Sequence, residues 1–217
     1  FGPFILSSRA FCFSVISGRF RLPAAPAPPP PPPVAFPFGL PLLEHLDADQ
    51  RHVQALILAP TRELGQQIAE QIALFAGRMK GIRTVAVYGG ANIVTQINQL
   101  KRPCQVVIAT PGRLIDLAKR KAVKLDQIKF LVLDEADEML NMGFKEELDT
   151  ILSFTPDEKK TWLFSATMPA KIRDFAKSAL INHLAVTIGR SGAANLDVIQ
   201  EVEYVKQEAK IVYLLEC

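Results

Sequence analysis

The stretch FLVLDEADEML, residues 130–140, places an apolar run directly before three carboxylates, Asp134, Glu135 and Asp137. Such a run is typical of a strand buried on both faces, as in a parallel sheet covered by helices. Carboxylates at this density usually hold a metal ion or activate water. In P-loop nucleotide-hydrolysing enzymes, an Asp at the end of a buried strand holds the Mg²⁺ that bridges two phosphates of ATP. The stretch therefore predicts an α/β fold and a candidate metal site.

Four more β-rich runs alternate with helical patterns in the surrounding sequence, and each ends in a short polar motif. The pairs are VQALILA with PTREL (60–64), IRTVAVY with GG (89–90), QVVIAT with TPGR (110–113), and TWLFSAT, which itself ends in SAT (165–167). Each motif alone could be an ordinary turn or helix start. Because the carboxyl ends of parallel strands lie along one edge of a sheet, we expect these motifs and DEAD (134–137) to meet in one cleft.

Two helical stripes lie between the predicted strands. They consist of Leu64, Ile68, Ile72, Phe75 and Met79, and of Ile93, Ile97 and Leu100. Their spacing predicts helices that pack one apolar side against the sheet.

The loop that cradles nucleotide phosphates in P-loop enzymes has the pattern G-x-x-x-x-G-K-[ST]. None of the 12 glycines is followed by Lys, so this sequence lacks that loop. The carboxylates after residue 133 are therefore one half of a nucleotide site without the other half.

Residues 1–43 differ in composition from the rest. They hold 11 of the 16 prolines, three basic residues and no acidic residue. The remaining 22 basic residues match 22 acidic ones, so the net charge of +3 comes from this leading segment. The overall charge is therefore no evidence for nucleic-acid binding.

The run PAAPAPPPPPPVAFP, residues 23–37, can be only extended or disordered, because proline lacks an amide donor. Three interpretations of the leader remain open: a targeting segment, a disordered extension, or non-coding sequence joined to an incomplete coding sequence, which we favour. In each case we expect residues 1–37 to pack against nothing. The uncharged stretch between Arg9 and Arg19 is too short to span a bilayer, so no membrane partner is expected.

The three cysteines, Cys12, Cys104 and Cys217, are far apart and form no C-x-x-C pair. This pattern favours an intracellular, reducing compartment, either cytoplasm or nucleus, or an organelle if the leader is a transit peptide. The three histidines have no metal-ligand spacing, so we assign no zinc.

In order and spacing, the motifs resemble those of the DEAD-box RNA helicases: PTREL, GG, TPGR, DEAD and SAT. The resemblance runs from about residue 40 to the end and implies a RecA-like parallel sheet with helices on both faces. It also implies ATP and Mg²⁺ as cofactors and RNA as partner. DEADEMLNMGF resembles bacterial members, whereas FAKSAL and residues 196–217 resemble the Abstrakt-type branch.

The resemblance also implies a role for each motif residue. Asp134 would hold Mg²⁺ through water, and Glu135 would orient and deprotonate the water that attacks ATP. Asp137 would couple the nucleotide site to RNA together with Ser165, Ala166 and Thr167. An RNA backbone would be contacted, without readout of base sequence, by Pro60, Thr61, Arg62, Glu63, Gly89, Gly90, Thr110, Pro111, Gly112 and Arg113.

The predicted organisation has three parts: a proline-rich segment (1–37), an incomplete RecA-like lobe (38–190), and a linker with the start of a second lobe (191–217). AFPFGLPLLEHL, residues 35–46, resembles the end of the helix that follows the P-loop in this family. The sheet is therefore expected to lack its P-loop strand, leaving neighbouring strands without ladder partners.

Three functions remain open. The first is an RNA-dependent ATPase that unwinds RNA, which we assign to the parent protein. The second is an RNA-binding or protein-interaction module without ATPase activity, which fits the chain as it stands. The third is an unrelated ATPase with only a D-E-A-D acidic box, and the TPGR and SAT motifs argue against it.

Overall fold

The computed structural model describes residues 4–6, 35–77, 79 and 81–187. Within them lies one parallel sheet with the strand order β3-β4-β2-β5-β6-β1-β7. The strands are β1 (Phe4–Leu6), β2 (Ala55–Leu58), β3 (Thr84–Val87), β4 (Val106–Ala109), β5 (Phe130–Leu133), β6 (Lys160–Phe164) and β7 (Leu184–Val186). The five strands predicted from the apolar runs are all present as β2 to β6. The predicted segment 191–217 lies outside the described residues.

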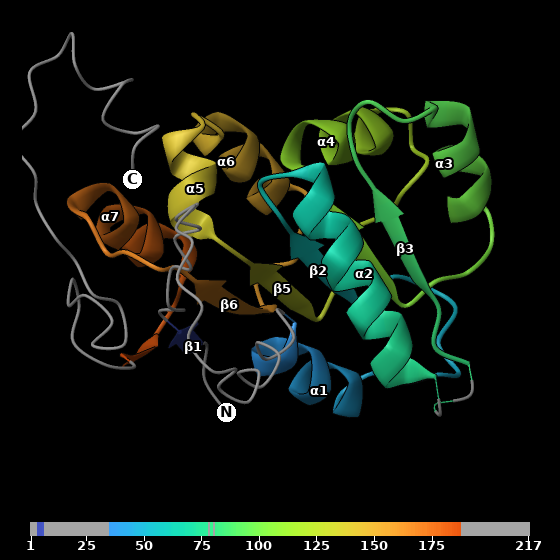
Figure 1. Cartoon of the computed structure of the whole chain (residues 1–217), viewed down its shortest axis with the longest axis horizontal. Coiled ribbons are helices and arrows are strands. Elements are labelled where there is room, and N and C mark those ends of the chain that lie inside the picture. Colours follow the sequence, from blue (N-terminus) through green and yellow to red (C-terminus); the bar gives the residue numbers. More distant parts are fainter. Residues whose placement is uncertain (1–3, 7–34, 78, 80, 188–217) are drawn as a thin grey trace, which may run out of the picture. The chain divides into compact units, whose positions relative to one another are not determined.

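Helices cover both faces of the sheet, as predicted. They are α1 (Phe36–Glu44), α2 (Arg62–Ala76), α3 (Ile93–Leu100), α4 (Pro111–Lys119), α5 (Ala136–Asn141), α6 (Lys145–Ser153) and α7 (Ala170–Ala179). Helices α1 and α2 pack in one hydrophobic cluster on the same face of the sheet, and α2 crosses in front of the strands in Figure 1. Residues of α4 to α7 pack in a separate hydrophobic cluster, and Ile93, Ile97 and Leu100 of α3 pack against it.

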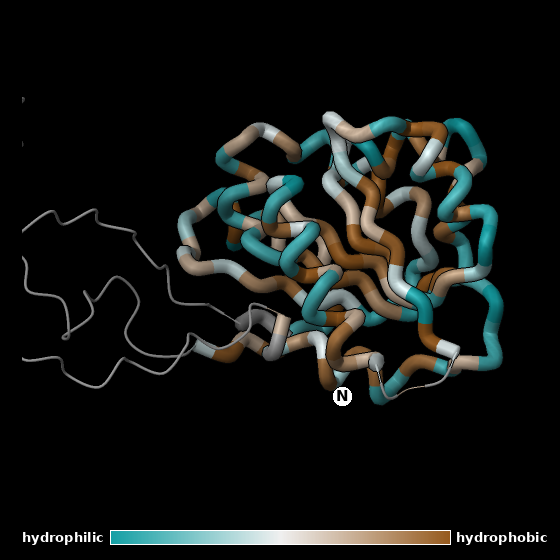
Figure 2. The backbone as a smooth tube through the Cα atoms, turned by 45° about the vertical axis from the view of Figure 1, so that its right-hand side comes forward, coloured by the Kyte–Doolittle hydropathy of each residue, from teal (hydrophilic) through white to brown (hydrophobic). Residues whose placement is uncertain are grey.

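Alternation along each strand creates these two cores. In β2, Ala55 and Ile57 join the cluster under α1 and α2, while Leu56 and Leu58 join the cluster under α4 to α7. Successive side chains of a strand point to opposite faces, so an uninterrupted apolar run is needed when both faces are covered. Figure 2 shows this as hydrophobic strands at the centre and hydrophilic segments on the outer helices.

Strand β1 corrects the expectation that residues 1–37 pack against nothing. Phe4–Leu6 pairs in parallel with β6 on one side and with β7 on the other. The expectation that a missing strand leaves its neighbours unpaired is also wrong for β6, which has ladder partners on both sides, β5 and β1. A run of three apolar residues is too short to indicate a strand by periodicity. The pairing of β1 depends on β6 and β7, which are formed by residues far away in the sequence.

Helix α1 begins before the predicted boundary at residue 38. Ala35 is fully buried, and its backbone N–H donates to Oε1 of Gln71 at 2.7 Å. Gly39 lets α1 approach α2 closely, because a Cβ there would lie 2.9 Å from Cδ1 of Ile72. The end of the run 23–37 is therefore helical and packed, not extended or disordered as expected, and the rest of the run lies outside the described residues.

The sequence also missed β7, whose three residues are mostly exposed and give no buried pattern. Of the first predicted stripe, Leu64, Ile68 and Ile72 are buried, whereas Met79 follows the end of α2 and is exposed. None of the helices in the described part of the chain is long and apolar enough to cross a membrane.

Candidate functional site

The polar motifs lie at one edge of the sheet, as predicted. The last residue of β2, Leu58, is in register with Ala109 of β4 and with Leu133 of β5. Leu133 is in register with Leu163 of β6, and Ala109 with Val87 of β3. All these strands run in the same direction, so the residues that follow each strand lie at the same edge of the sheet. PTREL, GG, TPGR, DEAD and SAT therefore border the same surface.

Asp134 is a buried carboxylate with half of its hydrogen-bonding capacity unused. The backbone N–H of Glu135 donates to its Oδ1 at 3.1 Å, while Oδ2 is buried with no hydrogen-bond partner. Burial, followed by the charges of Glu135 and Asp137, raises the pKa of Asp134 from 3.8 to about 7, although the hydrogen bond from Glu135 opposes this. An unpaired buried carboxylate is costly unless a cation or donor reaches it.

Glu135 has a left-handed backbone, with φ 49° and ψ 51°. A non-glycine residue in this region is strained, and such strain is concentrated at functional sites. Partial desolvation of the carboxyl group, followed by the charges of Asp137 and Glu138, raises its pKa above 4.5. A carboxylate with a raised pKa and an exposed position is suited to accept a proton from water.

The residues present fit a magnesium ion held mainly by other ligands. Among the described residues, no cluster of three or more His, Cys, Asp or Glu side chains could enclose an ion. Mg²⁺ usually keeps several waters and binds through one or two carboxylates plus substrate phosphates. Asp134, whose Oδ2 is unpaired, supplies the one carboxylate that this way of binding Mg²⁺ needs.

Asp137 joins the DEAD segment to the SAT segment. It is buried, and its Oδ2 accepts from the backbone N–H of Thr167 at 2.9 Å and from its hydroxyl at 2.7 Å. The hydroxyl of Ser165 does not contact Asp137 but donates to the carbonyl of Thr167 at 2.5 Å. Ser165 therefore stabilises the turn 165–167, which also contains Ala166. The alternative that SAT caps the next helix is excluded, because α7 begins after Pro169 without a side-chain cap.

Thr61 and Thr110 both stand at helix N-termini but differ in what their hydroxyls do. Thr61 accepts from the backbone N–H of Leu64 at 3.2 Å, which is the ordinary capping role. Thr110 precedes α4, and its side chain makes no capping hydrogen bond. Pro60 and Pro111 are buried, so neither is accessible to a ligand, whereas Glu63 is exposed on the first turn of α2. The hydroxyl of Thr110 is therefore the better placed of the two for a ligand.

The glycines of this edge leave open space. A Cβ added at Gly89 or Gly112 would meet no atom within 4 Å. Gly90 differs, because its φ of +76° is a conformation that side-chain-bearing residues rarely adopt. No contact within the described structure therefore requires glycine at 89 or 112.

The two arginines of the motifs make different contacts. The guanidinium of Arg62 lies 5.1 Å from the ring centroid of Tyr88 and is exposed. The guanidinium of Arg113 is half-buried and donates to the carbonyl of Ala91 through both terminal nitrogens, each at 3.1 Å. It also donates to Oε1 of Gln96 at 2.8 Å.

Sequence reasoning missed two residues at this edge, Tyr88 and Gln96. Gln96 is 4% exposed, and its Nε2 donates to the carbonyl of Tyr88 at 3.1 Å. The signal was present, because Gln96 falls at helical spacing from Ile93 and Leu100, on the predicted apolar face. A polar residue at such a position needs buried partners.

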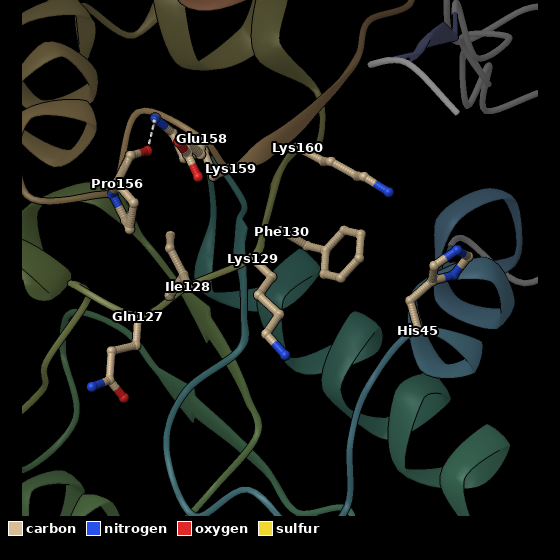
Figure 3. Close-up of a pocket in the computed structure, with 9 residues that line it drawn as sticks. All are labelled: His45, Gln127, Ile128, Lys129, Phe130, Pro156, Glu158, Lys159 and Lys160. Atoms are coloured by element: carbon tan, nitrogen blue, oxygen red, sulfur yellow. Dashed lines mark hydrogen bonds between the residues drawn. The ribbon is translucent and has the colours of Figure 1, made fainter.

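A separate hollow of about 420 Å³ lies at the opposite edge of the sheet, where β5 and β6 begin. Figure 3 shows the side chains of Lys129 and Lys160 beside Phe130, and Lys159 turned to the carbonyl of Pro156 at 3.0 Å. The basic groups point in different directions, and none of the sequence motifs lines this hollow.

Comparison with known proteins confirms the resemblance. The chain is 47% identical over 167 residues to DEAD-box ATP-dependent RNA helicase 35B of rice and 45% identical over 167 residues to the ATP-dependent RNA helicase abstrakt of Drosophila melanogaster. Each alignment covers 75% of this chain and 27% of the relative. Helicase CshA of Streptococcus pneumoniae is 53% identical over 136 residues, which are 63% of this chain and 26% of CshA. The chain thus matches both an Abstrakt-type and a bacterial member of the family.

Solved structures show the same RecA-like fold class. A DEAD box protein from Methanococcus jannaschii matches with a TM-score of 0.70 and 33% identity, over 86% of this chain and 45% of that protein. The yeast protein dbp5, solved with nup159, gle1, ip6 and adp, matches with a TM-score of 0.69 and 25% identity, over 87% of this chain and 44% of dbp5.

The chain spans about a quarter of the length of the curated relatives it matches. The sequence model of the DEAD/DEAH box helicase family matches residues 36–175, which include all five strand-end motifs. The chain therefore belongs to the DEAD/DEAH box helicase family.

Proposed function

We propose that this chain is the part of an ATP-dependent RNA helicase that binds an RNA backbone and carries the acidic half of the nucleotide site. The observation that carries the proposal is the convergence of PTREL, GG, TPGR, DEAD and SAT at one sheet edge. In this arrangement, an RNA surface and a hydrolytic carboxylate share one scaffold.

The RNA contacts proposed here involve phosphate and sugar. Gly89 and Gly112 offer open space for a close approach, and the amides at the start of α4 favour an anion. The uncommitted hydroxyl of Thr110 and the exposed cation of Arg62 add polar contacts. Contacts of this kind carry no sequence information, so the RNA would be selected by strandedness and shape.

For hydrolysis, we assign the binding of Mg²⁺ through water to Asp134. The bound ion would neutralise charge on the phosphates. The Glu135 carboxylate would orient the attacking water and accept its proton. The contact between Asp137 and Thr167 would pass changes at the DEAD segment to the loop after β6. The sequence has no G-x-x-x-x-G-K-[ST] loop, so these 217 residues alone are proposed to bind RNA without ATP turnover.

The first prediction is weak, salt-sensitive binding of single-stranded RNA by the 217-residue chain. A plot of log K against log salt concentration should have a slope of about −0.7 to −1.4, since each phosphate neutralised on a single strand contributes about −0.7. Fluorescence anisotropy with labelled oligonucleotides of different base composition measures both affinity and slope. Arg62→Gln should make the slope about 0.7 less steep. A folded chain that does not bind RNA, or that requires one base sequence, contradicts the proposal.

The second prediction uses Gly112, at which stability and binding should change in opposite directions. Gly112 is inside α4, has no positive φ and has room for a Cβ. Gly112→Ala should therefore raise the free energy of unfolding by about 0.5 kcal/mol, because alanine is the better helix former. It should weaken RNA binding, because the added methyl group occupies the space left for the backbone.

The matched control for Gly112→Ala is Ser153→Ala, a change at the exposed last residue of α6, outside the five motifs. It should leave RNA affinity unchanged. Urea titration and anisotropy on the same preparations give both quantities. Unchanged or tighter RNA binding by Gly112→Ala would remove Gly112 from the proposed contact surface.

The proposal includes an intracellular, reducing compartment. The few and widely spaced cysteines support it, and the one in the described residues, Cys104, is a buried thiol whose pKa is raised by that burial.

A further inference from the structure

The loop 88–91, which contains the GG motif, is held at both ends by side chains from other elements. At its start, the carbonyl of Tyr88 accepts from Nε2 of Gln96 at 3.1 Å, and the Tyr88 hydroxyl accepts from Nε2 of Gln66 at 2.8 Å. At its end, the carbonyl of Ala91 accepts two hydrogen bonds from the guanidinium of Arg113. Between these points lie two exposed glycines.

Gln96 connects the two ends of the loop. Its Nε2 donates toward Tyr88, and its Oε1 accepts from Nη1 of Arg113 at 2.8 Å. The reverse amide orientation would face a nitrogen donor toward the guanidinium and an oxygen toward a carbonyl, so the network fixes this orientation. Gln96 is 4% exposed, so both contacts are shielded from water. Losing a hydrogen bond at such a buried site is costly, because water cannot replace the missing partner.

We propose that Gln96 and Arg113 are positioning residues that clamp loop 88–91 in the conformation needed for the RNA strand. The inference rests on the RNA-binding function proposed above. It revises the sequence-based role of Arg113: three of its hydrogen bonds go to Ala91 and Gln96, so its main task is to hold the loop. Gln96 lies in none of the five motifs.

The clamp explains how glycines can be useful in this loop. Glycine has the largest conformational freedom of any residue, so an unrestrained Gly-Gly pair would lose entropy whenever RNA ordered it. Hydrogen bonds at Tyr88 and Ala91 restrict the pair before RNA arrives. The binding surface is thus pre-organised, which favours affinity without adding contacts to the ligand.

The first test needs no RNA. NMR relaxation of the full 217-residue chain gives backbone order parameters for Gly89 and Gly90. We expect values near about 0.85 in the unmodified chain and below about 0.6 in Gln96→Ala and in Arg113→Met. Asn98→Ala, an exposed change on the same helix, serves as the control and should leave the loop rigid. A loop that stays equally rigid in both clamp variants overturns the proposal.

The second test separates a clamp from a phosphate contact. Gln96→Ala and Arg113→Met should each bind single-stranded RNA about tenfold more weakly. The double variant should lose little further affinity, because the two residues act as one unit. The salt slope should not change in Arg113→Met, whereas loss of a phosphate contact would make it less steep by about 0.7. Arg113→Lys keeps the charge but not the forked geometry, so it should not restore affinity.

The outcomes distinguish this inference from the proposed function. If the unmodified folded chain fails to bind RNA, the proposed function fails, while the order parameters still decide whether the clamp exists. If RNA binds and a loosened loop leaves affinity unchanged, loop 88–91 is not part of the RNA surface and the inference is wrong. Rescue by Arg113→Lys, or a less steep slope in Arg113→Met, would make Arg113 a direct phosphate ligand.

Discussion

Glu135→Gln should lower RNA-stimulated ATP turnover about 100- to 10,000-fold, the usual loss when a general base is removed. The protein for this experiment is an extended form that carries a G-x-x-x-x-G-K-[ST] loop before residue 35 and a second lobe. Glutamine has nearly the same shape as glutamate but cannot accept the proton of the attacking water. The hydrogen bond to Oδ1 of Asp134 comes from the backbone N–H of residue 135, so the substitution leaves it in place.

ATP binding should therefore survive the change. Phosphate release in a single turnover measures hydrolysis, and a fluorescent ATP analogue measures binding. Glu146→Gln, an exposed change on α6, is the matched control and should keep turnover close to that of the extended parent. Turnover that persists in Glu135→Gln would show that another group is the base. RNA-dependent hydrolysis by the unextended chain would contradict the argument from the missing loop.

Asp134→Asn should raise the free energy of unfolding by about 2 kcal/mol at pH 8, although it removes a proposed Mg²⁺ ligand. The asparagine Oδ1 can still accept from the N–H of Glu135, and no buried charge remains. Repulsion by Glu135 and Asp137 also disappears. Urea denaturation without Mg²⁺ measures the difference.

The effect of Asp134→Asn should depend on pH in a defined direction. The folded pKa of Asp134, about 7, lies above its ordinary value of 3.8, so the folded state binds the proton more tightly. The destabilisation by Asp134 is therefore complete above pH 7 and declines as pH falls from 7 toward 3.8. The advantage of Asp134→Asn should shrink over the same range.

The control for this prediction is Asp116→Asn, an exposed carboxylate that pairs with Arg120 at 2.7 Å. Because surface ion pairs contribute little, its effect should stay within about 0.5 kcal/mol. If Asp134→Asn is the less stable protein at pH 8, the carboxylate of Asp134 is better compensated than its unpaired Oδ2 indicates.

Local sequence signals were enough to predict the strands that carry the motifs and several of the helices. FLVL is apolar throughout because both faces of β5 are covered, so the run itself marks a buried strand. Thr61 caps α2, and Pro111 occupies the first turn of α4. Both features depend only on residues close together in the sequence. The parallel order of the motifs then placed the candidate site at the carboxyl ends of the strands.

Contacts between distant residues could not be predicted in this way. Arg113 reaches Ala91, 22 positions earlier, only because β3 and β4 are neighbours in the sheet. Thr167 reaches Asp137 because β5 and β6 pair. The short strand Phe4–Leu6 has no pattern of its own and acquires its structure from β6 and β7.

By itself, the sequence determined the α/β class, the family and the set of motifs at the carboxyl edge of the sheet, because apolar periodicity, capping and motif order are local properties of a chain. The tertiary structure alone decided what those residues do with one another. It left Oδ2 of Asp134 without a partner, committed Arg113 to the loop, and brought Gln96 between Tyr88 and Arg113. These features depend on strand order and burial, which arise only when segments far apart in the sequence pack together.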